Sequence, residues 1–191
     1  QNLTGKRIGS NDAAWQLTLQ PDGTTWRLIK TVADGMHYYK FVVRKGAQTL
    51  WLTDPSAREV APDGFNSNPA FWNAVRGRVF ARPRVLPEPI ERSRLVIYEI
   101  APNDFSTTGT FAGAQAGLMS GASLVELGVN AVEFMPVTAP SYNGWGYDPV
   151  LQFAPNPSYG NPANFAGLVD AMHAQGIAVI LDAVVNNMSG S

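Results

Sequence analysis

Two groups of side chains in the second half of the chain could contact a ligand directly. The first is the loop Trp145-Gly146-Tyr147-Asp148-Pro149, which sets aromatic rings beside a carboxylate. The second is Asp182 with Asn186 and Asn187, which follow the apolar run 177–181. Aromatic faces stack on apolar surfaces, whereas carboxylates and amides form hydrogen bonds. Because the chain has no cysteine and only two histidines, thiolate nucleophiles and cysteine-zinc sites are excluded.

The composition is that of a folded protein. Of the 191 residues, 45% are hydrophobic and 15% are charged, which argues against intrinsic disorder. The formal net charge of −1 excludes a nucleic-acid binder that works by neutralising phosphates. The apolar run 177–181 is far shorter than the roughly 18 to 20 residues that span a bilayer. Neither nucleic acid nor a membrane is therefore an expected partner.

Prolines and turn signals divide the chain into two parts. Residues 1–84 carry short aromatic-rich segments separated by turns such as Pro21-Asp22-Gly23, which is typical of an antiparallel β-domain. Residues 85–94 contain Pro87 and Pro89, whose rings remove a backbone donor and keep the chain extended. This segment is predicted to be a linker. The hydrophobic pattern changes over residues 95–191, which are predicted to fold separately.

Three apolar runs after the linker predict strands. They cover residues 95–100, 131–136 and 177–185 and are rich in β-branched or aromatic residues. Such runs are typical of strands that are buried on both faces of a parallel sheet. Right-handed crossovers would place the connecting helices on one side of three adjacent parallel strands.

Helix signals lie between these runs. Asn161 is a candidate N-cap, Pro162 suits the first helical position, and Gly176 can end the helix. An apolar stripe at helical spacing joins them: Phe165, Leu168, Val169 and Met172. A weaker helix before residue 131 is predicted from Leu118, Leu124 and Leu127, closed by Gly128. The resulting order βαβαβ is that of an α/β unit.

Three parallel strands do not close a sheet. An eight-stranded α/β barrel needs about 250 residues, so we expect the protein to continue beyond Ser191. The alternative is a small open sheet with two edges, which would need a partner to cover them.

Six segments of residues 95–191 resemble, in order, the start of the catalytic barrel in the α-amylase family of glycoside hydrolases, in its branching, debranching and trehalose-forming groups. They are residues 96–100, 109–111, 127–137, 145–149, 153–160 and 182–186. Residues 15–66 resemble the immunoglobulin-like glycogen- and starch-binding β-sandwich that precedes the barrel in those groups. Together the resemblances imply a two-domain α+β chain, in which an N-terminal antiparallel β-sandwich is followed by a partial, truncated TIM-type β/α barrel.

The resemblance implies roles for the residues of the 145–149 loop and of the N-terminal part. Tyr147 matches a tyrosine that stacks on the sugar at the cleavage subsite. Asp148 could accept a sugar hydroxyl or start a turn before Pro149, and both readings stay open. Trp51 and Lys40 match glucan-binding positions of the β-sandwich, although Trp51 could equally be a core residue. Trp26 is predicted to lie in the core.

The residues after the third strand also match family positions. Asp182 corresponds to an aspartate that orients an arginine near the nucleophile, or it is a strand-end carboxylate satisfied by backbone donors. Asn186 matches a calcium ligand of calcium-dependent amylases, so calcium is a possible cofactor and no other is expected. Asn187 stands where the family usually has a histidine that donates to the sugar; an amide donates but carries no proton or charge. His37 and His173 are predicted to be surface residues that do not replace it.

The resemblance implies a retaining mechanism with two carboxyl groups, a nucleophile and an acid. In the family both come from later barrel strands, so neither is expected in this chain. The chain is therefore predicted to be inactive alone. The first functional reading is the N-terminal portion of a glycoside hydrolase or transferase acting on α-1,4 or α-1,6 bonds of glycogen, starch or maltooligosaccharides. The others are a non-catalytic glucan-binding protein and a scaffold protein. The expected partners are an α-glucan and the remainder of the barrel or a second chain.

Overall fold

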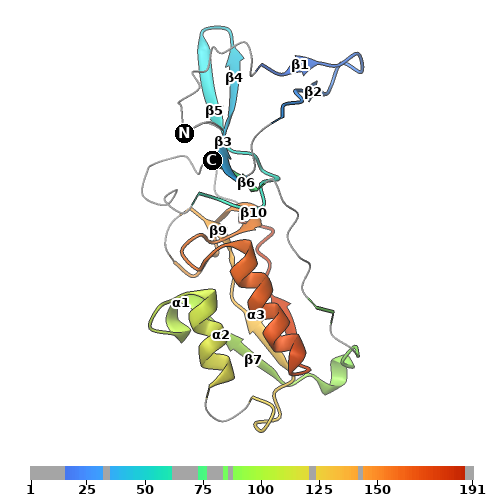
Figure 1. Cartoon of the computed structure of the whole chain (residues 1–191), viewed down its shortest axis with the longest axis vertical. Helices are drawn as coiled ribbons and strands as arrows, with labels where there is room; N and C mark the ends of the chain where they lie inside the picture. The colour runs from blue at the N-terminus through green and yellow to red at the C-terminus, as the bar shows by residue number, and fades with distance from the viewer. Residues whose placement is uncertain are drawn as a thin grey trace.

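The structure, a computed structural model, describes residues 16–31, 35–61, 73–76, 84–85, 88–120, 124–141 and 144–187. Strand pairs of the N-terminal part lie in the upper half of Figure 1, and a sheet with its helices lies in the lower half. The predicted change of pattern after the linker is therefore visible as a change of architecture.

The N-terminal part consists of antiparallel strand pairs. The pairs are β1 (Thr18–Leu19) with β2 (Trp26–Arg27), β3 (Met36–Tyr39) with β6 (Asn73–Arg76), and β4 (Phe41–Lys45) with β5 (Gln48–Leu52). The antiparallel pairing is as predicted. The three pairs belong to separate sheets among the described residues, so the β-sandwich itself stays a prediction.

Two predictions about side chains of this part are wrong. Trp26 is 61% exposed rather than in the core; its strand β2 belongs to a sheet of only two strands among the described residues. His37 is only 6% exposed rather than on the surface; it lies in β3, in register with Val75 of β6. Beside it, the Tyr39 hydroxyl donates to Asp54 Oδ2 at 2.5 Å.

The turn between β1 and β2 is organised by Asp22. Its Oδ1 accepts hydrogen bonds from the backbone N–H groups of Thr24 and Thr25, at 2.9 and 2.8 Å. The side chain of Thr25 and these backbone donors stabilise the carboxylate, so the pKa of Asp22 falls to about 2. Gly23 supplies the left-handed backbone of the turn, with φ of 73°.

The last residue of the predicted N-terminal part, Arg84, contacts the helix that follows residue 161. The backbone N–H of Arg84 donates to the Asp170 carboxylate, and the Arg84 carbonyl accepts a hydrogen bond from His173 Nδ1. His173 is half-buried rather than fully on the surface. The predicted linker, residues 85–94, contains a short 3-10 turn, η2 (Arg92–Arg94).

The second part contains the predicted parallel sheet. Its strands are β7 (Ile97–Ile100), β8 (Ala131–Phe134) and β11 (Ala178–Leu181), with β8 in the centre. Both pairs are parallel and in register, so that Ala131 lies beside Ile97 and Ala178. Three adjacent parallel strands are confirmed, and the described residues form no closed barrel.

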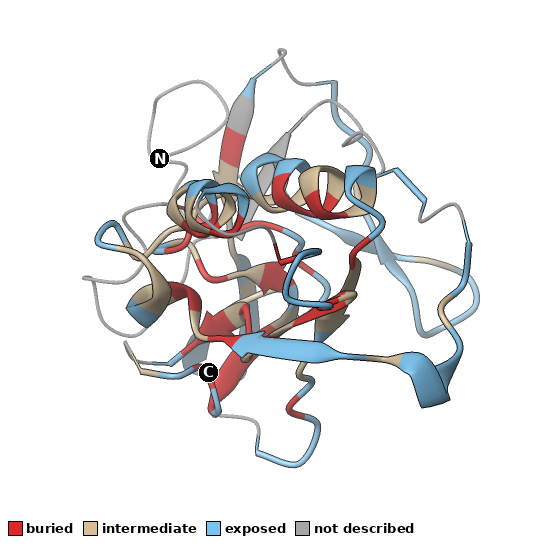
Figure 2. Cartoon of the chain, turned by 90° about the horizontal axis from the view of Figure 1, so that it is seen from below, coloured by how far each residue is buried: buried red, intermediate tan, exposed pale blue. Residues whose placement is uncertain are grey.

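Three helices accompany the sheet: α1 (Pro102–Phe105), α2 (Phe111–Met119) and α3 (Pro162–Ala174). Figure 2 shows two longer helices side by side over the strands, with buried residues on the side turned to the sheet. Their shared core consists mainly of Ile100, Phe111, Leu118, Val132, Phe134, Leu168 and Met172. None of the described helices is long and apolar enough to cross a membrane.

The sequence signals located α3 correctly but placed the end of α2 too late in the chain. Asn161 caps α3, its side chain and that of Asn164 bonding each other's backbone N–H at 3.0 Å. The helix α2 begins after its cap Thr110 and ends at Met119, so the predicted continuation through Leu124 to Gly128 is wrong. Residues 124–128 form a turn instead.

An unpredicted antiparallel hairpin follows β8. It consists of β9 (Thr138–Pro140) and β10 (Pro149–Pro155). The prolines at the ends of its strands indicate a loop in the sequence, because proline has no backbone N–H to donate to a neighbouring strand. This hairpin carries the 141–148 loop, which holds the candidate site.

Candidate functional site

The carboxyl ends of the three parallel strands meet at one edge of the sheet. Asp182 directly follows β11, and its backbone N–H extends the ladder to the Phe134 carbonyl at 3.0 Å. Because side chains alternate along a strand, the residues next to the helix-covered Ile100 and Phe134 face the other way. They are Glu99 and Glu133, which are register partners. The face of the sheet opposite the helices therefore carries acidic side chains near the strand ends.

The loop 141–148 is closed at its base by Asp148. The Ser141 N–H donates to the Asp148 carbonyl at 3.1 Å, and the Ser141 hydroxyl donates to the Asp148 carboxylate. Asp148 is buried. This contact supports the turn-forming reading of Asp148 that the sequence left open.

Tyr147 connects this loop to the end of β11. Its hydroxyl donates to Asp182 Oδ2 at 2.8 Å, and its ring is 42% exposed. The hydrogen bond to Asp182, followed by burial and by the charges of Asp182, Glu99 and Glu133, raises the pKa of Tyr147. The phenol is therefore held as a neutral donor, with a ring that a ligand can reach.

Asn187 holds the same two loops together. Its Nδ2 donates to the backbone carbonyl of Tyr147 at 2.8 Å. Nearby, Gln152 Nε2 donates to the Val184 carbonyl at 2.6 Å. The sequence-predicted residues Tyr147, Asp182 and Asn187 thus form one connected group, which we call the mouth network.

The order of three consecutive loop residues follows the order of the strands in the sheet. Trp145 Nε1 donates to Asp104 Oδ2 at 3.2 Å, in α1 just after β7. Gly146 packs on Pro136, just after β8: a Cβ added to this glycine would lie 2.5 Å from the Pro136 carbonyl oxygen. Tyr147 reaches Asp182, just after β11. The loop therefore crosses the ends of all three strands.

A family profile described as "Alpha amylase, catalytic domain" matches residues 99–191, the span that contains the strand ends and the mouth network. These residues belong to the α-amylase family. Malto-oligosyltrehalose trehalohydrolase of Mycobacterium tuberculosis is 33% identical over 187 residues, which are 97% of this chain and 31% of that protein. A 1,4-alpha-glucan branching enzyme of Burkholderia vietnamiensis is 31% identical and matches 82% of this chain and 23% of its own length. The chain thus spans less than a third of these relatives.

Solved structures of similar fold agree with this assignment. A crystal structure of a Salmonella typhimurium protein assigned as an alpha amylase superposes with a TM-score of 0.70 and 30% identity, covering 85% of this chain and 26% of that one. The GBS pullulanase SAP in complex with maltotetraose gives a TM-score of 0.63 at 24% identity, over 77% of this chain and 24% of its own. The second likeness concerns the fold alone.

The two N-terminal candidates lie apart from the mouth network and outside the residues that match the α-amylase family. Trp51 is half-exposed on β5, opposite Val42. Lys40 lies between β3 and β4, where burial lowers its pKa. The β4–β5 hairpin stands at the top of Figure 1, whereas β7 lies in the lower part. Trp51 and Lys40 could therefore serve only a separate glucan contact.

The calcium-ligand role of Asn186 stays a prediction. Asn186 is exposed, and the described residues contain no group of three or more carboxylate or histidine side chains that could hold a metal ion. Calcium prefers six to eight oxygen ligands. No step of the chemistry below therefore depends on calcium.

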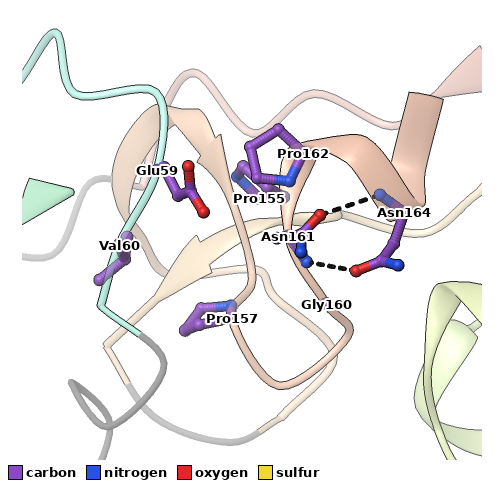
Figure 3. A pocket seen from close by; sticks show the side chains of 8 residues that line it. All are labelled: Glu59, Val60, Pro155, Pro157, Gly160, Asn161, Pro162 and Asn164. Carbon is purple, nitrogen blue, oxygen red and sulfur yellow. Dashed lines mark hydrogen bonds between the residues drawn. The ribbon is translucent and has the colours of Figure 1, made fainter. Parts of the chain in front are cut away.

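A pocket of about 230 Å³ lies away from the mouth network (Figure 3). Its walls come from Glu59 and Val60 on one side and from the Pro155–Asn164 region at the start of α3 on the other. The capping side chains Asn161 and Asn164 are already bonded to backbone groups there. We therefore interpret this pocket as the contact between the N-terminal part and α3.

The sequence did not single out three residues that position the network. Ser141 closes the loop, Asp104 holds the Trp145 indole, and Gly146 allows close approach to Pro136. Only Gly146 had a local signal, because a glycine between two aromatic residues is typical of a tight backbone approach. The other two depend on tertiary contacts.

Proposed function

We propose that this chain supplies one substrate-binding wall of an α-glucan-active glycoside hydrolase or transferase. The observation that carries the proposal is the mouth network, in which Tyr147, Asp182 and Asn187 from two loops meet at the carboxyl ends of parallel strands. Barrel enzymes place their sites at this edge of the sheet. The trehalohydrolase, whose match covers 97% of the chain, makes a maltooligosyltrehalose our first choice of substrate.

In this proposal the Tyr147 ring forms the floor for one pyranose ring. An aromatic face suits the apolar underside of a sugar, and the bond to Asp182 fixes the ring plane before the ligand arrives. Preorganisation of this kind reduces the entropy that binding would otherwise lose. Asn187 holds the two loops at the required separation through the Tyr147 carbonyl.

The electrostatic contribution comes from carboxylates on the face of the sheet opposite the helices. Retaining glycosidases pass through a transition state with oxocarbenium-ion character, in which positive charge develops on the sugar. Glu99, Glu133 and Asp182 all act on Tyr147 electrostatically, so their negative field also reaches a sugar stacked there. Fixed negative charge stabilises developing positive charge. The nucleophile and the acid would come from other strands of the enzyme.

Binding of maltotetraose by the full chain tests the proposal, measured by isothermal titration calorimetry. Tyr147→Ala should weaken binding roughly tenfold or more, as truncation of a central aromatic contact does. Tyr147→Phe should lose less, because it keeps the ring and loses only the bond to Asp182. Phe153→Ala is the matched control, since Phe153 is an exposed aromatic residue outside the mouth network.

Two results would contradict the proposal. One is the absence of maltotetraose binding by the chain, and the other is equal affinity of the wild type and Tyr147→Ala. A reducing-sugar assay addresses the catalytic part separately. The purified chain should release no sugar from glycogen, whereas release by the 191 residues alone would show that they contain the catalytic carboxylates.

A further inference from the structure

We propose that residues 57–61 of the N-terminal part position the mouth network by packing against the β9–β10 hairpin, which carries the 141–148 loop. Val60 is the positioning residue, and it acts on Tyr147 through the hairpin without contacting a ligand. The coupling itself depends only on contacts within the chain, whereas its effect on a bound sugar rests on the proposed function.

The segment 57–61 shares a small core with the hairpin. Ala57 and Val60 are each 3% exposed. They form one cluster of buried side chains with four residues of the hairpin: Ala139, Val150, Leu151 and Ala154. This cluster is separate from the core between the parallel sheet and its helices. Among the described residues, the segment is thus the part of the chain outside the hairpin that completes this cluster.

The cluster lies close to the base of the 141–148 loop. Ala139 and Leu151, which both belong to it, are register partners across the hairpin. Ala139 precedes Ser141 by two residues, and Leu151 follows Asp148 by three. Ser141 and Asp148 close the loop through their hydrogen bonds. Because a two-stranded hairpin is only marginally stable by itself, the position of this loop depends on what packs against the hairpin.

The turn before the segment is held by the Asp54 carboxylate. Its Oδ1 accepts from the Ser56 N–H at 2.8 Å, and its Oδ2 accepts from the Tyr39 hydroxyl at 2.5 Å. The Asp54 carbonyl accepts from the Ala57 N–H at 3.1 Å. Burial, followed by the contact with Asp54, raises the pKa of Tyr39, so the phenol stays a donor at neutral pH. The start of the segment is therefore fixed to the end of β3.

The hairpin connects the segment to the end of β11. Gln152 Nε2 donates to the Val184 carbonyl at 2.6 Å, and the Tyr147 hydroxyl donates to Asp182 Oδ2 at 2.8 Å. Loss of packing at Val60 would let the hairpin shift relative to β11. Hydrogen bonds weaken steeply when their distance and angle leave the normal range. The bond between Tyr147 and Asp182 should therefore respond to a change at Val60.

Titration of Tyr147 in the full chain tests the coupling, followed by NMR of the tyrosine Cζ carbons and assigned with Tyr147→Phe. In the wild type, the bond to Asp182 holds the pKa of Tyr147 above 10.0, and Val60→Ala should move this pKa towards 10.0. Val129→Ala is the matched control, because Val129 is a buried valine of the other core cluster. The pKa of Tyr147 should keep its wild-type value in this variant.

Two further variants separate positioning from general loss of stability. Val60→Ile keeps the branched side chain and should preserve the wild-type titration of Tyr147, because a pocket of about 230 Å³ beside residue 60 has room for another methyl group. Asp54→Ala releases the turn before the segment and should shift the titration in the same direction as Val60→Ala. It also provides the test if Val60→Ala does not fold. Hydrogen exchange should become faster over residues 138–155 in both shifted variants and stay unchanged over residues 97–100.

An unchanged titration of Tyr147 in Val60→Ala and Asp54→Ala would refute the coupling, as would an equal shift in Val129→Ala. Calorimetry with maltotetraose then tests the consequence for the proposed site. Val60→Ala should bind this sugar several-fold more weakly than the wild type, whereas Val129→Ala should bind it equally well. A shifted titration with unchanged affinity would refute the effect on sugar binding alone. If the wild type binds no maltotetraose, the proposed function fails, and the titration still decides whether the segment positions Tyr147.

Discussion

Replacing Gly146 with alanine should disturb both the stability of the chain and the mouth network. Gly146 has φ of 86°, a conformation that costs an L-residue about 1–2 kcal/mol. An added Cβ would also lie 2.5 Å from the Pro136 carbonyl oxygen and 3.0 Å from the Pro136 Cβ. The oxygen belongs to the backbone after β8, so it cannot move aside without displacing the strand end.

Gly128 provides a matched control, because it has a similar φ of 76° but nothing within 4 Å of an added Cβ. Gly128→Ala should therefore lose only the conformational term, about 1–2 kcal/mol. Gly146→Ala adds the overlap, and insertion of a methyl group into a packed site typically costs about 1–3 kcal/mol. The entropy lost by the unfolded chain is the same in both variants and cancels.

Urea denaturation measures the free energy of unfolding of both variants, with an unchanged m value showing that the difference is one of stability. We expect Gly146→Ala to be less stable than Gly128→Ala by about 1–3 kcal/mol. Its maltotetraose affinity should also fall, because Trp145 and Tyr147 flank the displaced residue. Equal losses of stability in the two variants would refute the close approach of Gly146 to Pro136.

Three further predictions concern other contacts. Asp182→Asn should lower the pKa of the Tyr147 hydroxyl towards its ordinary value of 10.0, because the substitution removes the carboxylate that raises it. In the wild type, the hydrogen bond stabilises the fold at neutral pH. This contribution is lost as pH rises through the elevated pKa of Tyr147. A midpoint that Asp182→Asn leaves unchanged would contradict this bond. Asn161→Ala should lower the free energy of unfolding by about 1 kcal/mol in urea, because it removes the cap of α3; no loss would show that the cap is dispensable. Asp22→Ala should be less stable than the wild type above pH 3.8, and the gap should close as pH falls through about 2, whereas a gap independent of pH would mean that the carboxylate charge does not hold the turn.

The elements that the sequence predicted well are those with local signals. The helix α3 has a cap, a proline at its start, an apolar stripe and a glycine after its end, all within residues 161–176. The three parallel strands have apolar runs, which are typical of a parallel sheet. The expected burial on both faces is wrong for β7, because three of its four residues are exposed. In α2, by contrast, the leucines at 124 and 127 have helical spacing, but the helix ends at Met119. Spacing alone did not locate its end.

The burial and contacts of individual side chains were harder to predict, because they depend on which other parts of the chain pack against them. Trp26 was assigned to the core by residue type, yet it is exposed on a short strand. His37 was assigned to the surface for the same kind of reason and is buried. The family resemblance identified Tyr147 and Asp182 as site residues. It did not predict the bond between them, because 35 positions of sequence separate the two residues.

The contact of Asn187 bears on the proposed site, because the resemblance leads one to expect a histidine at this position. The amide donates to the Tyr147 carbonyl, and a neutral donor is sufficient for that bond. Histidine would change its charge near pH 6.5, so the asparagine makes the connection between the two loops independent of pH in that range. It also adds no positive charge beside Glu99, Glu133 and Asp182, whose fields converge on Tyr147. In the proposed function, the negative potential at a sugar stacked on Tyr147 would therefore be stronger with asparagine than with a protonated histidine. On this proposal, the site lacks a charged donor to a sugar hydroxyl but retains the negative field that would stabilise positive charge on the ring.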